Sequence, residues 1–237
     1  MTEIKTGVIK PIECFKEGWN LIKNDYWILF AISLVGAIIG GMSFYVLIGA
    51  MICGIYYCFL QAIDGKPISF DGLWKGFGYF LPSLLVTILI VVPMFVVLGV
   101  IYVPMIIAAI MGPRLSSDEF FGLFFGAVAV DFVLIVIMTC FHTLLLFSFP
   151  LIVDRNLGAW ESVTTSAKAV WRNLSGVAGL IGGGIVLSLF GIITCGLGMY
   201  FIMPILLAGY AVAYRKIFPI QTNRNFDPPT PDFYQGI

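Results

Sequence analysis

The sequence predicts an all-α integral membrane protein, and three observations lead to this. Of its 237 residues, 60% are hydrophobic and 11% are charged, whereas about 25% of residues are charged in a typical soluble domain. The mean hydropathy is +1.02. Residues 26–63 carry no charge, and as a helix this run is about twice as long as one crossing of the bilayer core requires. It must therefore fold back on itself.

Breaks in the apolar runs divide the chain into six predicted crossings. The pairs Gly40-Gly41 and Gly196-Leu197-Gly198 favour turns, because glycine is a poor residue for a helix interior. The run 79–111 holds three prolines without a polar turn, so it is interpreted as one long kinked helix. The predicted crossings are residues 26–41, 44–63, 79–111, 119–153, 174–194 and 198–214. Splitting both overlong runs, 79–111 and 119–153, would give eight.

The basic residues predict the orientation of these crossings. Six crossings place 12 of the 13 Lys and Arg residues on the side of the N-terminus and leave only Arg114 on the other. Basic residues concentrate on the cytoplasmic side of membrane proteins. Both termini are therefore predicted to be cytoplasmic.

A short amphipathic stretch precedes each pair of crossings. Apolar residues recur at steps of three and four in residues 8–23, 69–78 and 158–172, which predicts helices lying in the cytoplasmic headgroup region. Ser69 is the predicted N-cap of the second. Tryptophans are typical anchors at this depth, and the predicted anchors are Trp19, Trp74, Trp160 and Trp171.

The first and third units, each a stretch followed by a pair of crossings, also resemble each other. Lys23-Asn24 aligns with Arg172-Asn173, and a hydrophobic hairpin follows each pair. An even number of crossings per unit predicts parallel repeats rather than inverted ones. Small residues spaced four apart allow helices to approach closely. The predicted packing positions are Gly36, Gly40, Gly122, Gly126, Gly179 and Gly183.

Asp131 and His142 are the candidate functional residues inside the membrane. An ionisable group at this depth costs several kcal/mol unless it is paired, so it is a functional candidate by default. The two residues share one predicted helix but lie about 16 Å apart along it, too far for a direct contact. The alternative interpretation is that each serves packing alone.

Catalytic, metal and cofactor motifs are not found. The sequence lacks H-E-x-x-H, G-x-S-x-G and the phosphate-binding G-x-x-x-x-G-K-[ST]. Its single histidine and five cysteines, none in a C-x-x-C pair, favour neither a zinc site nor a disulfide framework. No enzyme activity, metal or cofactor is expected.

The balance of 13 basic and 13 acidic residues gives no basic surface for nucleic acid. Residues 219–237, rich in proline, are predicted to form a disordered cytoplasmic tail.

Residues 149–217 resemble a known group of proteins. The run Phe149-Pro150-Leu151-Ile152-Val153-Asp154-Arg155 is followed by an amphipathic segment and a glycine-rich hairpin that ends at Tyr214-Arg215-Lys216. This pattern is similar to small bacterial multi-pass proteins, namely the membrane domain fused to some glycerophosphodiester phosphodiesterases and the YciC-like family. The resemblance implies six helices and a bacterial cytoplasmic membrane. It does not carry over the phosphodiesterase activity, because no such soluble domain is present.

The function expected from the sequence is a non-enzymatic one. We expect a scaffold, accessory subunit or component of envelope homeostasis that contacts the lipid bilayer and other membrane proteins, or a second copy of itself. The alternative is a transporter or channel for a small solute or lipid that uses Asp131.

Overall fold

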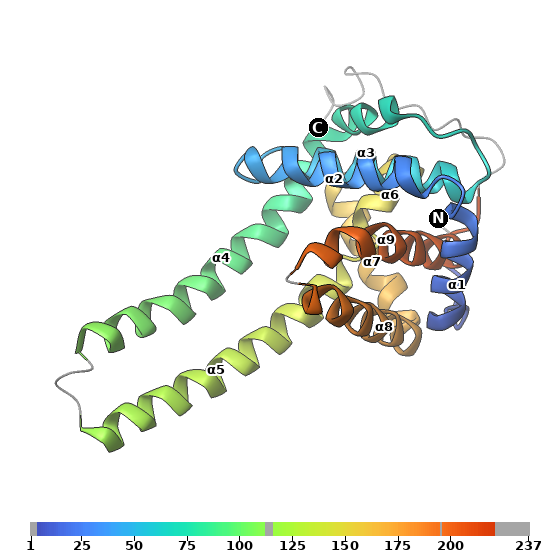
Figure 1. The fold of residues 1–237 in the computed structure, drawn as a ribbon. Coiled ribbons are helices and arrows are strands. Elements are labelled where there is room, and N and C mark those ends of the chain that lie inside the picture. The colour runs from blue at the N-terminus through green and yellow to red at the C-terminus, as the bar shows by residue number, and fades with distance from the viewer. Residues whose placement is uncertain (1–3, 112–115, 195, 221–237) are drawn as a thin grey trace. The chain divides into compact units, whose positions relative to one another are not determined.

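The computed structural model describes residues 4–111, 116–194 and 196–220, and within them the fold is all-α, as predicted. Figure 1 labels the helices. In chain order they are α1 (Pro11–Ile22), α2 (Tyr26–Met42), α3 (Ile48–Ile63), the 3₁₀-helix η1 (Phe70–Tyr79), α4 (Phe80–Met111), α5 (Ser117–Leu144), α6 (Ser148–Arg155), α7 (Ala159–Arg172), α8 (Leu174–Ile193) and α9 (Leu197–Ile217). The predicted tail, residues 219–237, lies outside the described residues from 221 onward.

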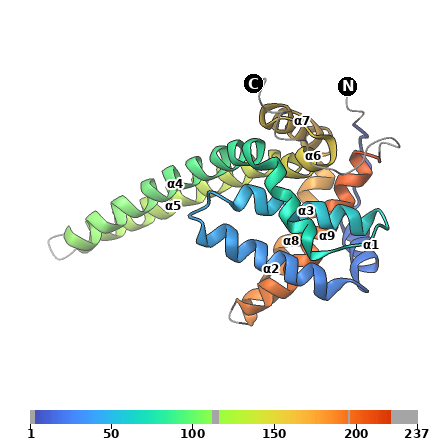
Figure 2. The same ribbon diagram turned by 90° about the horizontal axis from the view of Figure 1, so that it is seen from above.

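The chain forms two compact units. Unit 1 comprises residues 1–87 and 144–237, and unit 2 comprises residues 88–143. Unit 1 holds the core, in which α3 and α9 contribute many of the fully buried side chains. Unit 2 consists of most of α4 and α5, which run in opposite directions (Figures 1 and 2).

Several helices are suited to crossing a membrane, which supports a multi-pass membrane protein. By length and composition, three helical runs qualify among the described residues, namely Phe70–Ile107, Asp118–Arg155 and Leu197–Ile217. The number rises to five if each of two bent helix pairs forms one span. The bends are 105° between α1 and α2 and 96° between α7 and the first part of α8. α3 is apolar but shorter than these spans.

The predicted crossing 119–153 lies within the candidate span Asp118–Arg155, but it consists of two helices, because α5 ends at Leu144 and α6 begins at Ser148. Pro150 has no N–H to donate to the carbonyl of Leu146, and its ring would clash there in a continuous helix. Ser166 of α7 satisfies the backbone at the break. Its hydroxyl donates to the carbonyl of Leu144 (2.7 Å) and accepts the N–H of Phe147 (3.0 Å).

The predicted helix at 69–78 is a 3₁₀-helix, η1. Its glycines are poor residues for an α-helix, and the contact with α3 is close. A Cβ on Gly76 would collide with the carbonyl of Ala50, and one on Gly54 of α3 would collide with the carbonyl of Leu73. Ser69 occupies the N-cap position, but its side chain makes no capping hydrogen bond.

The turn between α2 and α3 is longer than predicted, so α3 begins at residue 48 instead of 44. Phe44 and Tyr45, rather than the glycine pair, take positive φ values of 50° and 68°. The Ser43 hydroxyl stabilises this turn, since it donates to the carbonyl of Gly40 (2.8 Å) and accepts the N–H of Leu47 (3.0 Å).

The three elements α1, η1 and α7 each precede a pair of long helices, and each packs against the end of another pair. η1 packs on α3, α7 on α6 and α1 on α9. These contacts close a ring in the order of the chain. The N-terminal segment completes it, because the Lys5 N–H donates to Ile217 (3.2 Å) and the Asn173 amide bonds Gly7 (2.8 Å) and Lys5 (3.0 Å).

Candidate functional site

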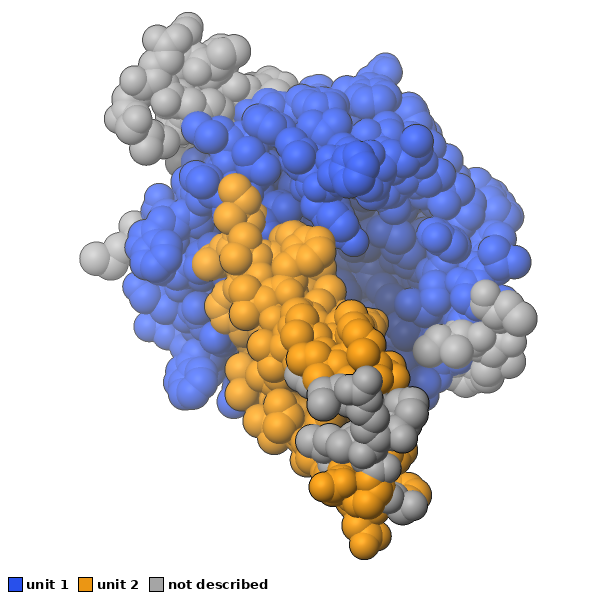
Figure 3. All heavy atoms as spheres, turned by 90° about the vertical axis from the view of Figure 1, so that its left-hand side faces the viewer, with its two compact units in different colours: residues 1–87, 144–237 blue, residues 88–143 orange. Residues whose placement is uncertain are grey.

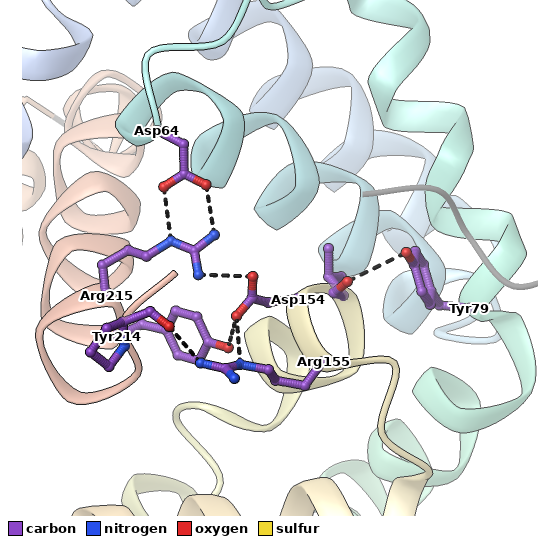
Figure 4. Close-up of polar contacts among 8 residues, drawn as sticks. Asp64, Tyr79, Asp154, Arg155, Tyr214 and Arg215 are labelled. Carbon is purple, nitrogen blue, oxygen red and sulfur yellow. Dashed lines mark hydrogen bonds and ion pairs between the residues drawn. The ribbon is translucent and has the colours of Figure 1, made fainter. Parts of the chain in front are cut away.

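Three helix ends in unit 1 bring their charged residues together (Figure 4). Asp64 directly follows α3, Asp154 lies at the end of α6, and Arg215 lies in the last turn of α9. Each ends a predicted apolar hairpin, so the sequence places all three at equivalent positions. We call Asp64, Asp154, Arg155, Tyr214 and Arg215 the charged cluster.

Arg215 is the centre of the charged cluster. Its Nε and Nη2 donate to the two carboxylate oxygens of Asp64, at 2.9 and 2.7 Å, in a bidentate pair. Its Nη1 lies 2.8 Å from Oδ1 of Asp154. The side chains are almost fully buried, with 9% of Arg215, 3% of Asp64 and 8% of Asp154 exposed. The planar guanidinium suits such paired carboxylates better than a lysine would.

The other oxygen of Asp154 is also used. Its Oδ2 accepts the hydroxyl of Tyr214 at 2.6 Å and Nε of Arg155 at 3.0 Å. The Nη2 of Arg155 donates to the carbonyl of Pro219 at 2.6 Å. Beside the cluster, the Tyr79 hydroxyl donates to the carbonyl of Val153 at 3.4 Å, which ties η1 to α6 (Figure 4).

The charged cluster has a structural role, because its ion pairs hold three helix ends together. Two carboxylates and two guanidiniums balance in charge, and each is paired with the opposite sign. Removing one partner of a buried pair leaves an uncompensated charge and costs about 3–5 kcal/mol. The cluster therefore joins the ends of α3, α6 and α9 and fixes their relative register.

The predicted intramembrane residues lie elsewhere, in unit 2. Asp131 is the fifteenth of the 28 residues of α5 and is half-buried. No hydrogen bond or ion pair to its carboxylate is present among the described residues. His142 is also half-buried, and its Nε2 lies 3.4 Å from the carbonyl of Ile90 on α4. The structure does not bring Asp131 and His142 together.

Unit 2, drawn in orange in Figure 3, has exposed apolar side chains on more than one side of each helix. On α5 the adjacent residues Phe124 and Phe125 are exposed, and so are Phe132 and Val133. Adjacent residues face different directions on a helix.

α5 begins with a capping box, in which the Ser116 N–H donates to Glu119 (2.9 Å) and the Glu119 N–H donates to the Ser116 hydroxyl (3.4 Å).

The predicted packing glycines have different surroundings. A Cβ on Gly36 or Gly40 would meet Ile55 or Ile48 of α3, and one on Gly179 or Gly183 would meet Pro11 or Phe15 of α1. At Gly122 and Gly126 it would meet nothing within 4 Å. The role of this last pair in packing stays a prediction.

All four predicted tryptophan anchors are exposed, Trp19 and Trp74 by 41% and 44%. α1 turns Gly18 inward and exposes Trp19, and η1 turns Gly72 and Gly76 inward and exposes Trp74. α7 buries Ser162, Ser166, Ala169 and Val170, and it exposes 76% of Trp160 and 73% of Trp171. The apolar residues predicted to form one stripe in 158–172 thus differ in exposure, since Trp160 and Trp171 are exposed, Val163 and Ala167 are half-buried and Val170 is buried.

Metal-ligating side chains do not gather in the parts of the chain that the structure describes. No group of three or more His, Cys, Asp or Glu residues there is arranged to hold a metal ion. Cys14, Cys53 and Cys58 are buried free thiols, and Cys140 is an exposed one.

No family model, curated protein or solved structure matches the chain. The resemblance to the bacterial membrane families therefore stays a prediction.

Sequence reasoning did not find the charged cluster. It used Arg215 only as a marker of the end of a hairpin. The available signal was the shared position of Asp64, Asp154 and Arg215, since a charged residue follows each apolar hairpin and both signs occur there. Which of these residues pair depends on the ring of contacts, and that ring is not visible in the sequence.

Proposed function

We propose that this protein is a non-enzymatic accessory or scaffold subunit of a larger membrane assembly, and that unit 2 is its docking element. One observation carries the proposal. Asp131 lies in the middle of α5, where residues 120–138 are otherwise apolar, and no described residue pairs with its carboxylate. A membrane-embedded carboxylate is costly without a partner, so a polar or basic group on a helix of another membrane protein is its best partner.

The proposal rests on a particular topology. We infer six crossings, made by α2, α3, α4, α5 with α6, α8 and α9, with both termini in the cytoplasm. The distribution of 12 of the 13 basic residues supports this orientation. It puts Asp131 inside the bilayer, since Asp131 lies 14 residues, about 21 Å, after the start of α5. The bacterial cytoplasmic membrane is the proposed location.

The division of the chain supports a docking role for unit 2. Unit 1 has its own buried core and the charged cluster, whereas unit 2 exposes apolar side chains on several sides. In a bilayer, polar groups that bond between helices and close packing drive helix association. A unit with its own buried core, together with a hairpin that carries exposed apolar side chains, is the form that a scaffold requires.

Crosslinking at the hairpin tests this proposal. A photoreactive amino acid at Phe132, which is 69% exposed and next to Asp131, is activated in native membranes, and the adducts are identified by mass spectrometry. We expect one protein adduct, which is lost in Asp131→Leu and kept in Thr139→Val. Thr139 is the matched control because its hydroxyl bonds Ile135 within the same helix (2.8 Å). Lipid adducts alone, or an adduct that Asp131→Leu does not change, would refute the proposal.

A transporter that uses Asp131 as its coupling residue is the second candidate. The same observation favours it, because a carboxylate without a protein partner can exchange protons with water along a pathway. In proteoliposomes, Asp131→Asn then abolishes the flux of the transported solute or lipid, while expression and thermal stability are unchanged. Under the scaffold proposal, Asp131→Asn keeps hydrogen-bonding capacity and alters binding less than Asp131→Leu does.

A further inference from the structure

α7 is oriented for contact with a membrane surface. It bends by 96° from the first part of α8, and α8 is a 20-residue helix without a charged residue. If α8 crosses the bilayer, a perpendicular α7 lies in the membrane plane. Helices of this kind lie with an apolar side among the headgroups and upper acyl chains.

The two sides of α7 differ in residue size and polarity, and the exposed side carries large aromatic residues that are unusual on a surface in water. The side that packs on the protein holds Ser162, Ser166 and Ala169, while the opposite side carries Trp160 and Trp171, both more than 70% exposed. The two tryptophans are eleven residues apart, which is close to three helical turns, so they share one side. Indole rings favour the bilayer interface, where one edge is apolar and the other is hydrated.

Two basic side chains lie beside this tryptophan side. Lys168 and Arg172 are exposed and one turn apart, and no ion pair involves either of them within the described parts of the chain. α1 differs, because Lys10 pairs with Glu13 (3.0 Å) and Glu17 pairs with Lys216 (2.7 Å).

We propose that the outward side of α7, made by Trp160, Lys168, Trp171 and Arg172, binds the headgroups of anionic phospholipids. The tryptophans enter the interface, and the long basic side chains extend to the phosphates. A basic residue near an anionic membrane surface favours binding by about fivefold, so Lys168 and Arg172 both favour anionic lipid beside α7. This inference concerns lipid at unit 1 and is independent of the docking role of unit 2.

Quenching of a single tryptophan by brominated lipid tests the proposal. The protein retains only Trp171, with Trp19, Trp27, Trp74 and Trp160 changed to Phe, and it is placed in phosphatidylcholine nanodiscs. A minor fraction of the lipid is either brominated phosphatidylglycerol or brominated phosphatidylcholine. We expect several-fold stronger quenching by the phosphatidylglycerol, a difference that falls at high salt because salt screens exposed charges.

The double variant Lys168→Gln/Arg172→Gln is expected to remove this preference and leave quenching equal for the two lipids. A protein that retains only Trp19 is the matched control, since its quenching should not change in the double variant and thereby reports intact folding. Equal quenching of Trp171 by both lipids in the unaltered α7 would overturn the preference for anionic lipid. No quenching by either lipid would show that this side of α7 faces water and would overturn the whole proposal.

Discussion

The guanidinium of Arg215 binds both carboxylate oxygens of Asp64, a residue 151 positions earlier in the chain. The pair joins the last turn of α9 to the end of α3. Through its remaining nitrogen, Arg215 also reaches Asp154 at the end of α6. One side chain therefore connects the ends of three helices that are distant in sequence.

Removing this side chain should destabilise unit 1 strongly. Arg215→Leu leaves Asp64 and Asp154 buried without their shared partner, and the expected loss is about 3–5 kcal/mol of unfolding free energy. The matched control is the neighbouring variant Lys216→Gln, whose pair with Glu17 is half-exposed and worth about 1 kcal/mol or less. Thermal unfolding in detergent measures both. Similar melting temperatures for the two variants would contradict the central role of Arg215.

The break between α5 and α6 should depend on one hydroxyl. Ser166→Ala removes the group that bridges Leu144 and Phe147, and the buried backbone groups then lose a partner at a cost of about 1–3 kcal/mol. Thr164→Ala on the same helix is the control, since its hydroxyl bonds only carbonyls of its own helix, and a change within about 0.5 kcal/mol is expected. Denaturation in detergent compares the two. If Thr164→Ala costs as much as Ser166→Ala, the bridge is not what stabilises the break.

Two glycine substitutions should act in opposite directions. Gly76→Ala places a methyl group against the carbonyl of Ala50, and such overpacking costs about 1–3 kcal/mol or more. Gly122→Ala meets open space and gains up to about 1 kcal/mol of helix propensity. Melting temperatures of the purified variants check the signs. A stabilising Gly76→Ala would show that η1 and α3 are less closely packed than described.

The ring of contacts brings the two ends of the described chain together, so a circular permutant with new termini should fold. Lys5 and Ile217 share a backbone hydrogen bond of 3.2 Å, so a short Gly-Ser linker can connect residues 219 and 4. New termini between Lys66 and Pro67 leave each pair of crossings intact. We expect the circular permutant to be monodisperse in detergent and to unfold cooperatively. An aggregated permutant, beside a monodisperse parent protein, would mean that the native connection between α3 and η1 is required.

Labelling should decide the number of crossings. In a cysteine-free protein, a cysteine at Asp118 is expected to react with a membrane-impermeant reagent added to intact cells. A cysteine at Lys66 is expected to react only after permeabilisation. The cysteine is placed at Asp118 and not at Ser116, because Ser116 caps α5 and its replacement would remove the cap. Protection of Asp118 in intact cells would favour eight crossings and place the loop before α5 in the cytoplasm.

The sequence by itself determined the membrane class, the helical fold and most helix positions. Uncharged apolar runs, paired glycines and amphipathic stretches are local signals, and burial in a bilayer requires helices wherever such runs occur. The start of α2 at Tyr26 and the amphipathic stretch before α8 follow from these signals. Trp160 and Trp171 are exposed, and their role at the interface stays a prediction.

Only the tertiary structure decided which residues meet. The backbone at the break before Ser148 is satisfied by Ser166 of another helix, and η1 fits closely against Gly54 of α3. The pairing of Arg215 with Asp64 likewise depends on how the ring closes. Hydropathy records how each residue partitions between water and lipid, but it holds no information about which two helices become neighbours. That choice follows from close packing and paired charges, which exist only once the chain has folded.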